Sequence, residues 1–214
     1  NPYQTPAHLL TCEGSDNLCL REFKQLSGIK PCYTNMADLD SIVKLMCVLV
    51  ETFLKNDKRA PYITIAAKHG NPCGLSLSWD DPEKAINGAL FGNPRAIWGG
   101  ELITNFVISE KIGSMLFQSQ KRNDALGDSH WMLDLIVAPE FQSEAIRILG
   151  KRNSRKLLQN KNLFDPRLGQ EAWSFRPIRG GYLRQPPNHF VLNWREFSNF
   201  PGNLDKSVID SIVV

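Results

Sequence analysis

A lysine and a histidine stand side by side at Lys68 and His69, directly after an apolar run at residues 62–67. The run is rich in β-branched residues, so it predicts a buried strand that ends at this pair. An imidazole with an ordinary pKa of about 6.5 can take or give a proton near neutral pH. We expect the neighbouring ammonium to lower the imidazole pKa, so that His69 serves as a general base and Lys68 stabilises an oxyanion or anchors an anionic substrate. The alternative is a surface lysine beside a hydrogen-bonded histidine.

The pair is followed by Asn71-Pro72-Cys73-Gly74, which is a turn signal. We predict a loop whose backbone amides face a ligand, or a tight loop with a structural role alone. The Pro-Cys step also invites comparison with zinc deaminases, which combine H-x-E with P-C-x-x-C. Residue 76 is a serine, and no histidine is followed two positions later by glutamate. We therefore predict no metal site, because zinc needs three or four converging ligands.

Two glycine pairs and one acidic residue complete the candidates for chemistry. Gly99-Gly100 and Gly180-Gly181 match neither G-x-G-x-x-G nor the Walker A pattern, so neither is a phosphate-binding fingerprint. Asp134 lies within the apolar run 133–138 and is a candidate buried carboxylate. The alternative for Asp134 is a strand-end residue bonded to a neighbouring loop.

Helices and strands are predicted to alternate along the chain. Periodicity and helix-start signals predict helices at residues 38–55, 83–90, 110–120 and 143–150, and apolar runs predict strands at residues 62–67, 102–108, 133–138 and 156–158. Two extended segments are expected within residues 173–184, and a further helix is expected to begin at residue 204. The alternation indicates an α/β layered fold with at least partly parallel strands. In such sheets ligand sites gather beyond the carboxyl ends of strands, where the Lys-His pair is expected to lie.

Composition narrows the class of protein. The chain has 214 residues, 42% of them hydrophobic, and a net charge of +3, which is too small to indicate a nucleic-acid partner. The densest basic stretch, residues 151–156, is expected to be a solvated helix end or loop, with an anion contact as the alternative. No segment supplies the roughly 18 apolar residues of a membrane span, and the first residues do not form a signal peptide. Five cysteines without a CxxC motif favour reduced thiols, so we expect a cytoplasmic protein with no membrane partner.

Several segments follow one another in an order shared with a known family. They are N-P-Y-Q-T-P-A at residues 1–7, Y-T-N-M-A-D-L-D at 33–40, I-A-A-K-H-G-N-P-C-G at 65–74, A-I-W-G-G at 96–100, L-I-V-A-P with E-A within 135–145, and R-G-G-Y-L-R-Q at 179–185. They resemble N-P-H-Q-x-x-A, Y-N-N-x-x-D-x-D, V-K-H-x-N-P-C-G, S-A-F-G-G, I-I-A-P with E-E-A-L, and N-G-G-L-L-V-Q. The chain thus resembles the first half of the AICAR transformylase domain in the AICAR formyltransferase/IMP cyclohydrolase family.

The resemblance implies an α/β, three-layer cytidine-deaminase-like fold with a mixed central sheet. Residues 1–214 are then expected to form a single domain that corresponds to the first cytidine-deaminase-like subdomain. Within it we expect an irregular N-terminal arm at residues 1–35 and the start of a truncated or shortened second half at residues 204–214.

The resemblance also implies an activity, which is transfer of a formyl group from 10-formyltetrahydrofolate to the amine of AICAR, giving FAICAR. It implies a homodimer whose small-molecule partners are AICAR and the folate. Carried onto this chain, His69 accepts the proton of the attacking amine, and Lys68 steadies the tetrahedral intermediate. The substrate-binding residues implied are Asn71, Pro72, Cys73, Gly74, Trp98, Gly99, Gly100 and Asp134.

Departures from the family pattern keep two further hypotheses open. Tyr3 stands where N-P-H-Q has histidine, and Ala96 and Trp98 stand where S-A-F-G-G has serine and phenylalanine. The family's R-Y-G segment and its second half, with the S-N-A segment and much of the folate pocket, lie outside this sequence. One alternative is a non-catalytic or partner-dependent homologue. The other is a formyltransferase that acts on a related aminoimidazole nucleotide.

Overall fold

The chain is described by a computed structural model that covers residues 4–11, 14, 16–169, 173–191, 193, 205 and 207–208. The helices are α1 (Tyr33–Asp57), α2 (Pro82–Gly92), α3 (Glu110–Phe117), α4 (Gln120–Leu126) and α5 (Ser143–Leu149), with short 3-10 turns η1 (Leu20–Glu22) and η2 (Lys161–Phe164). The strands are β1 (Lys24–Ser27), β2 (Tyr62–Lys68), β3 (Asn71–Ser78), β4 (Gly100–Thr104), β5 (Leu133–Ala138), β6 (Lys156–Gln159), β7 (Ser174–Ile178) and β8 (Gly181–Gln185).

Six strands form one mixed sheet in the order β1-β6-β5-β4-β2-β3. The central strands β4, β5 and β6 are parallel, whereas β1, β2 and β3 run antiparallel to their neighbours. The predicted α/β class with a mixed, partly parallel sheet is therefore confirmed. Because β2 is antiparallel to β4, with Ala67 opposite Glu101, the carboxyl end of β2 lies beside the amino ends of the parallel strands. The Lys-His pair thus lies at the end of the sheet opposite the carboxyl ends of β4 to β6.

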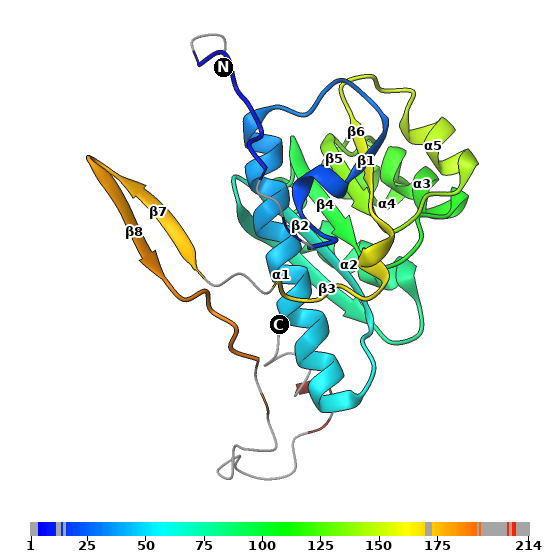
Figure 1. The fold of residues 1–214 in the computed structure, drawn as a ribbon. Coiled ribbons are helices and arrows are strands. Elements are labelled where there is room, and N and C mark those ends of the chain that lie inside the picture. The colour runs from blue at the N-terminus through cyan, green and yellow to red at the C-terminus, as the bar shows by residue number, and fades with distance from the viewer. Residues whose placement is uncertain are drawn as a thin grey trace.

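Two apolar clusters hold helices on both faces of the sheet, which gives three layers (Figure 1). On one face the long helix α1 buries Leu39, Met46 and Phe53 against side chains such as Ile63. On the other face α2, α3 and α5 cover the sheet. The hairpin of β7 and β8 stands away from this layered body (Figure 1). Within the described residues, no helix is long and apolar enough to cross a bilayer.

Helix ends differ from the predictions because capping groups come earlier than the periodicity suggests. Helix α1 begins at Tyr33, five residues before the predicted start, since Asn35 Oδ1 accepts from the backbone N–H of Cys32 at 3.2 Å and organises the first turn. The helix predicted at 110–120, α3, ends earlier, at Phe117, and a separate helix, α4, begins at Gln120. Each has a serine N-cap, Ser109 or Ser119, whose hydroxyl accepts a backbone N–H.

Two further predictions, for the N-terminal arm and for the strand at 102–108, need correction, and a third lies almost wholly outside the described residues. The N-terminal arm at residues 1–35 is not irregular throughout, because β1 pairs with β6 at the edge of the sheet. The predicted strand at 102–108 is shorter and earlier, as β4 ends at Thr104. Almost all of the helix predicted at residues 204–214 falls outside the described residues.

The basic stretch at residues 151–156 is not a fully solvated loop, because its last two side chains are buried. Arg155 is 1% exposed and donates to the carbonyl oxygens of Trp131 and Leu133, at 2.7 and 3.2 Å. Burial, with the charge of Arg152 adding, lowers the pKa of Arg155 to about 10. The guanidinium binds carbonyl groups at the start of β5, so this part of the stretch stabilises the fold.

Candidate functional site

His69 lies at the tip of a tight turn that joins β2 to β3. Lys68 pairs with Asn71, so His69 and Gly70 are the two central residues of the turn, and both have positive φ, 55° and 71°. Such turns match the twist of a hairpin, but a left-handed conformation costs a non-glycine residue about 1 kcal/mol. The amide of Asn71 donates to the carbonyl of His69 at 2.9 Å, which holds the turn. The imidazole is exposed, and no described residue hydrogen-bonds to it.

Lys68 connects the turn to the first glycine pair. Its Nζ donates to the carbonyl oxygen of Trp98. A Cβ on Gly100 would lie 2.5 Å from the carbonyl oxygen of Ala67, so only glycine lets β2 and β4 approach this closely. Gly99 has a φ of 69° and its amide donates to a backbone carbonyl at 2.6 Å. The structure therefore brings the Lys-His pair and the Trp-Gly-Gly segment together at one end of the sheet, beside the amino ends of β4 and β5.

Asp134 lies at the same end of the sheet but is half-buried, so the prediction of a buried carboxylate there was wrong. It is the second residue of β5, and its Oδ2 lies 3.9 Å from the point where a Cβ on Gly99 would stand. The amino ends of β4 and β5 are adjacent, which is why these two residues meet.

The buried carboxylate is Glu101, the residue after the glycine pair, which is only 3% exposed. Its Oε1 accepts from the amide of Asn35 at 3.1 Å, while Oε2 meets no hydrogen-bond donor. Burial raises the pKa of Glu101 to about 8, and the charges of Asp38 and Asp134 add to the rise. A raised pKa favours the protonated form of Glu101 near neutral pH, and the neighbouring carboxylate of Asp38 acts in the same direction as burial.

Asp38, the partner of Glu101 in this carboxyl pair, lies beside the turn that carries His69. Asp38 Oδ1 is 3.7 Å from the point where a Cβ on Gly70 would stand, and Asp38 itself is 7% exposed. Sequence reasoning missed the pair, although two signals were present. Asn35 and Asp38 are three residues apart and so share one helix face, and Glu101 interrupts an apolar strand directly after two glycines.

Replacement of Glu101 by glutamine should flatten the pH dependence of stability. Because the folded-state pKa is raised above the ordinary 4.5, the stabilising contribution of protonated Glu101 is fully present below that value and is lost as pH rises through about 8. Glu101→Gln keeps the shape and removes the titration. Between pH 5.5 and 8.5, urea unfolding of the wild type should lose on the order of 2 kcal/mol more than unfolding of the variant.

The exposed residue Glu140 offers the matched control, since Glu140→Gln removes a carboxylate far from the pair. Its unfolding should follow the wild-type pH dependence. Equal pH dependence of Glu101→Gln and the wild type would show that Glu101 is not protonated in the folded protein.

Residues 71–74 form the start of β3 and not the predicted loop. Their backbone pairs with β2, with Pro72 opposite Ala67 and Gly74 opposite Ala66, and an irregularity separates the two pairs. Pro72 fits because β3 is an edge strand, where a missing N–H is tolerated. The segment therefore belongs to the sheet, and Asn71 alone adjoins the turn.

Cys73 is half-buried within β3, where its thiol donates to the carbonyl of Ala66 at 3.5 Å. Burial raises the pKa of Cys73, and the nearby Glu101 adds to the rise. A thiol with a raised pKa is a poor nucleophile at neutral pH. Cys73 therefore acts as a packing residue between the sheet and α2.

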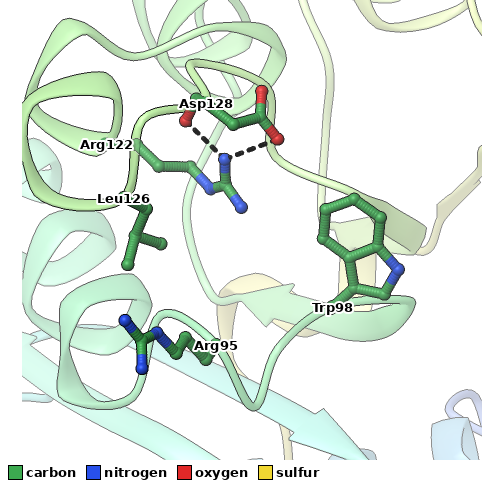
Figure 2. A pocket seen from close by; sticks show the side chains of 5 residues that line it. All are labelled: Arg95, Trp98, Arg122, Leu126 and Asp128. Carbon is green, nitrogen blue, oxygen red and sulfur yellow. Dashed lines mark hydrogen bonds and ion pairs between the residues drawn. The ribbon is translucent and has the colours of Figure 1, made fainter.

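Trp98 also lines a hollow of about 340 Å³ (Figure 2). The chemical groups gathered at this end of the sheet are the exposed imidazole of His69, the half-buried ammonium of Lys68, the glycine pair and the buried carboxyl group of Glu101. An imidazole and an ammonium at adjacent positions can remove a proton from a nucleophile and stabilise negative charge on an oxygen.

Comparison with known proteins places this geometry in context. A family model described as AICARFT/IMPCHase bienzyme matches residues 1–203. Curated relatives include the bifunctional purine biosynthesis protein PurH of Staphylococcus aureus strains Newman and USA300, each 27% identical over 192 residues. Each alignment covers 90% of this chain and 33% of the relative. The chain thus spans about one third of the length of the curated relatives it matches.

Proposed function

The chain belongs to the AICARFT/IMPCHase bienzyme family, and from that premise we propose that it acts in purine biosynthesis by formyl transfer. The reaction is transfer of the formyl group of 10-formyltetrahydrofolate to the amine of AICAR, giving FAICAR. The observation that carries the proposal is the placement of Lys68 and His69. The ammonium reaches the carbonyl of Trp98, and the imidazole stands free beside it at the tip of the turn.

In the proposed reaction His69 accepts the proton that the AICAR amine loses as its nitrogen bonds to the formyl carbon. Lys68 stabilises the negative charge that develops on the formyl oxygen. The bond from the formyl carbon to the folate nitrogen then breaks, and His69 returns the proton to that nitrogen. The AICAR amine is a weak nucleophile, so positioning and electrostatic stabilisation supply most of the rate.

The proposed substrate contacts centre on Trp98, Gly99 and Asp134, which lie together at the amino ends of β4 and β5. Asn71 joins them through the turn. Gly100 serves by allowing the close approach of β2 and β4. We further propose that this three-layer fold is of the cytidine-deaminase-like type. The proposal also includes a homodimer, which analytical ultracentrifugation of the purified protein would test.

The experiment measures FAICAR formation from AICAR and 10-formyltetrahydrofolate. Because the chain spans one third of its relatives, it is assayed alone and mixed with the remaining part of a relative. The expected result is heat on titration with AICAR, and turnover in at least one of the two assays. Absence of both would contradict the proposal. AICAR binding without turnover would favour a non-catalytic homologue, and turnover of another aminoimidazole nucleotide alone would favour a different substrate.

A further inference from the structure

The hollow beside Trp98 carries cationic groups that the proposed transfer reaction does not use. It is lined by Arg95, Trp98, Arg122, Leu126 and Asp128. Figure 2 shows the two arginine side chains and the indole disposed around the same space. The segment after α2 supplies Arg95 and Trp98, and α4 with the residues after it supplies the others. The hollow therefore lies between these two segments of the chain.

Arg122 is a fixed guanidinium with unused donors. The residue is 4% exposed, and Nη1 donates to the carbonyl oxygen of Asp128 and pairs with its carboxylate at 2.9 Å. The guanidinium lies 5.1 Å from the ring centre of Trp131 and 6.0 Å from that of Trp98. Its Nε is buried and meets no hydrogen-bond acceptor. A buried arginine with an unpaired N–H is costly unless a further acceptor binds there.

Arg95 and Trp98 form the open side of the hollow. The side chain of Arg95 is exposed and makes no ion pair or hydrogen bond within the described residues, while Trp98 is 49% exposed. Two guanidinium groups face one carboxylate, so the hollow has an excess of positive charge. That carboxylate is engaged, because Asp128 also accepts from the backbone N–H of His130 at 2.9 Å.

We propose that this hollow binds a small ligand in which an oxyanion, carboxylate or phosphate, is carried on a single flat ring. Guanidinium groups bind such oxyanions through paired N–H donors, and the exposed face of Trp98 provides a surface for ring stacking. The volume of about 340 Å³ is near the lower end for small-molecule sites and suits one ring with its anionic group. Trp98 belongs both to this hollow and, through its carbonyl, to the Lys68 contact.

The test is calorimetric titration of the protein with phenyl phosphate and with benzoate, two probes that carry no formyl group. Binding is expected in the roughly 0.1–1 mM range for at least one probe, and which probe binds identifies the oxyanion. Arg95→Gln removes an exposed side chain without a described partner, so the variant should fold normally. It is expected to weaken binding about tenfold, the loss of one charge-assisted pair.

A matched control is available elsewhere on the surface. Arg59 also stacks on a tryptophan, 4.7 Å from the ring centre of Trp79, but lies outside the hollow. Arg59→Gln should bind the probes as the wild type does. Cyclohexanecarboxylate and inorganic phosphate, which lack a flat ring, should bind at least about fivefold more weakly.

Four results would overturn the proposal. They are no binding of either aromatic probe, unchanged binding by Arg95→Gln, equal weakening by Arg59→Gln, and equal affinity for the ring-free anions. Formyl transfer plays no part in any of these titrations. The outcome is therefore separable from the success or failure of the proposed function.

Discussion

Substitution of His69 by asparagine is expected to reduce formyl transfer by about 10²–10⁴-fold while leaving the protein folded and slightly more stable. The loss follows from removal of the proposed base. The gain follows from the turn, since Asn-Gly is the preferred pair where both central residues have positive φ, as His69 and Gly70 do. The expected increase in the free energy of unfolding is about 0.5 kcal/mol. Steady-state kinetics and urea unfolding on the same samples measure both effects.

The opposite signs make the His69→Asn variant informative. A histidine retained for structure alone would give a variant with wild-type activity, which would exclude the base. The exposed His189 provides the control, because His189→Asn should change neither the rate nor the stability. A His69→Asn protein that lost both activity and stability would show that the imidazole supports the fold, contrary to the roles proposed.

Substitution of Gly74 by alanine is expected to destabilise the protein by about 3 kcal/mol or more. A Cβ at this position would lie 1.9 Å from the carbonyl oxygen of Ala89, which is backbone and cannot rotate away. The contact belongs to a close packing of β3 against α2, in which a Cβ on Gly88 would likewise lie only 2.1 Å from the hydroxyl oxygen of Ser76. Relief of the overlap must separate the helix from the strand that follows the His69 turn.

Gly181→Ala is the matched control, since a Cβ there would meet no atom within 4 Å. Its stability should stay within about 0.5 kcal/mol of the wild type. Thermal unfolding by circular dichroism would compare the two variants. A Gly74→Ala protein as stable as Gly181→Ala would show that α2 and β3 are not packed as described.

Sequence reasoning succeeds where burial on both faces leaves a long apolar signal. The strands at residues 62–68 and 133–138 are continuous apolar runs because central strands contact helices on both sides. A helix was predicted to start at residue 83, and the side chain of Asp81 does cap it by accepting from the backbone N–H of Glu83 at 2.8 Å. These signals are local in the sequence, and the structure confirms the two strands and the helix start.

The errors have physical causes at particular residues. Asn71 and Pro72 carry turn propensity, but the edge position of β3 tolerates both, and the turn itself falls two residues earlier, at His69 and Gly70. No local rule places a histidine at positive φ. The raised pKa of Glu101 arises where α1 and β4 meet across the core, so it depends on tertiary contacts that a single segment does not contain.

Titration of AICAR into ¹⁵N-labelled protein, followed through the imidazole nitrogens of His69, tests most directly whether the substrate amine binds at the end of β2. The predicted result is a saturable shift of the His69 signals, with those of His189 unchanged and the shift weakened when Lys68 is replaced by methionine. His69 signals that remain fixed at saturating AICAR would contradict the assignment of this turn as the active site.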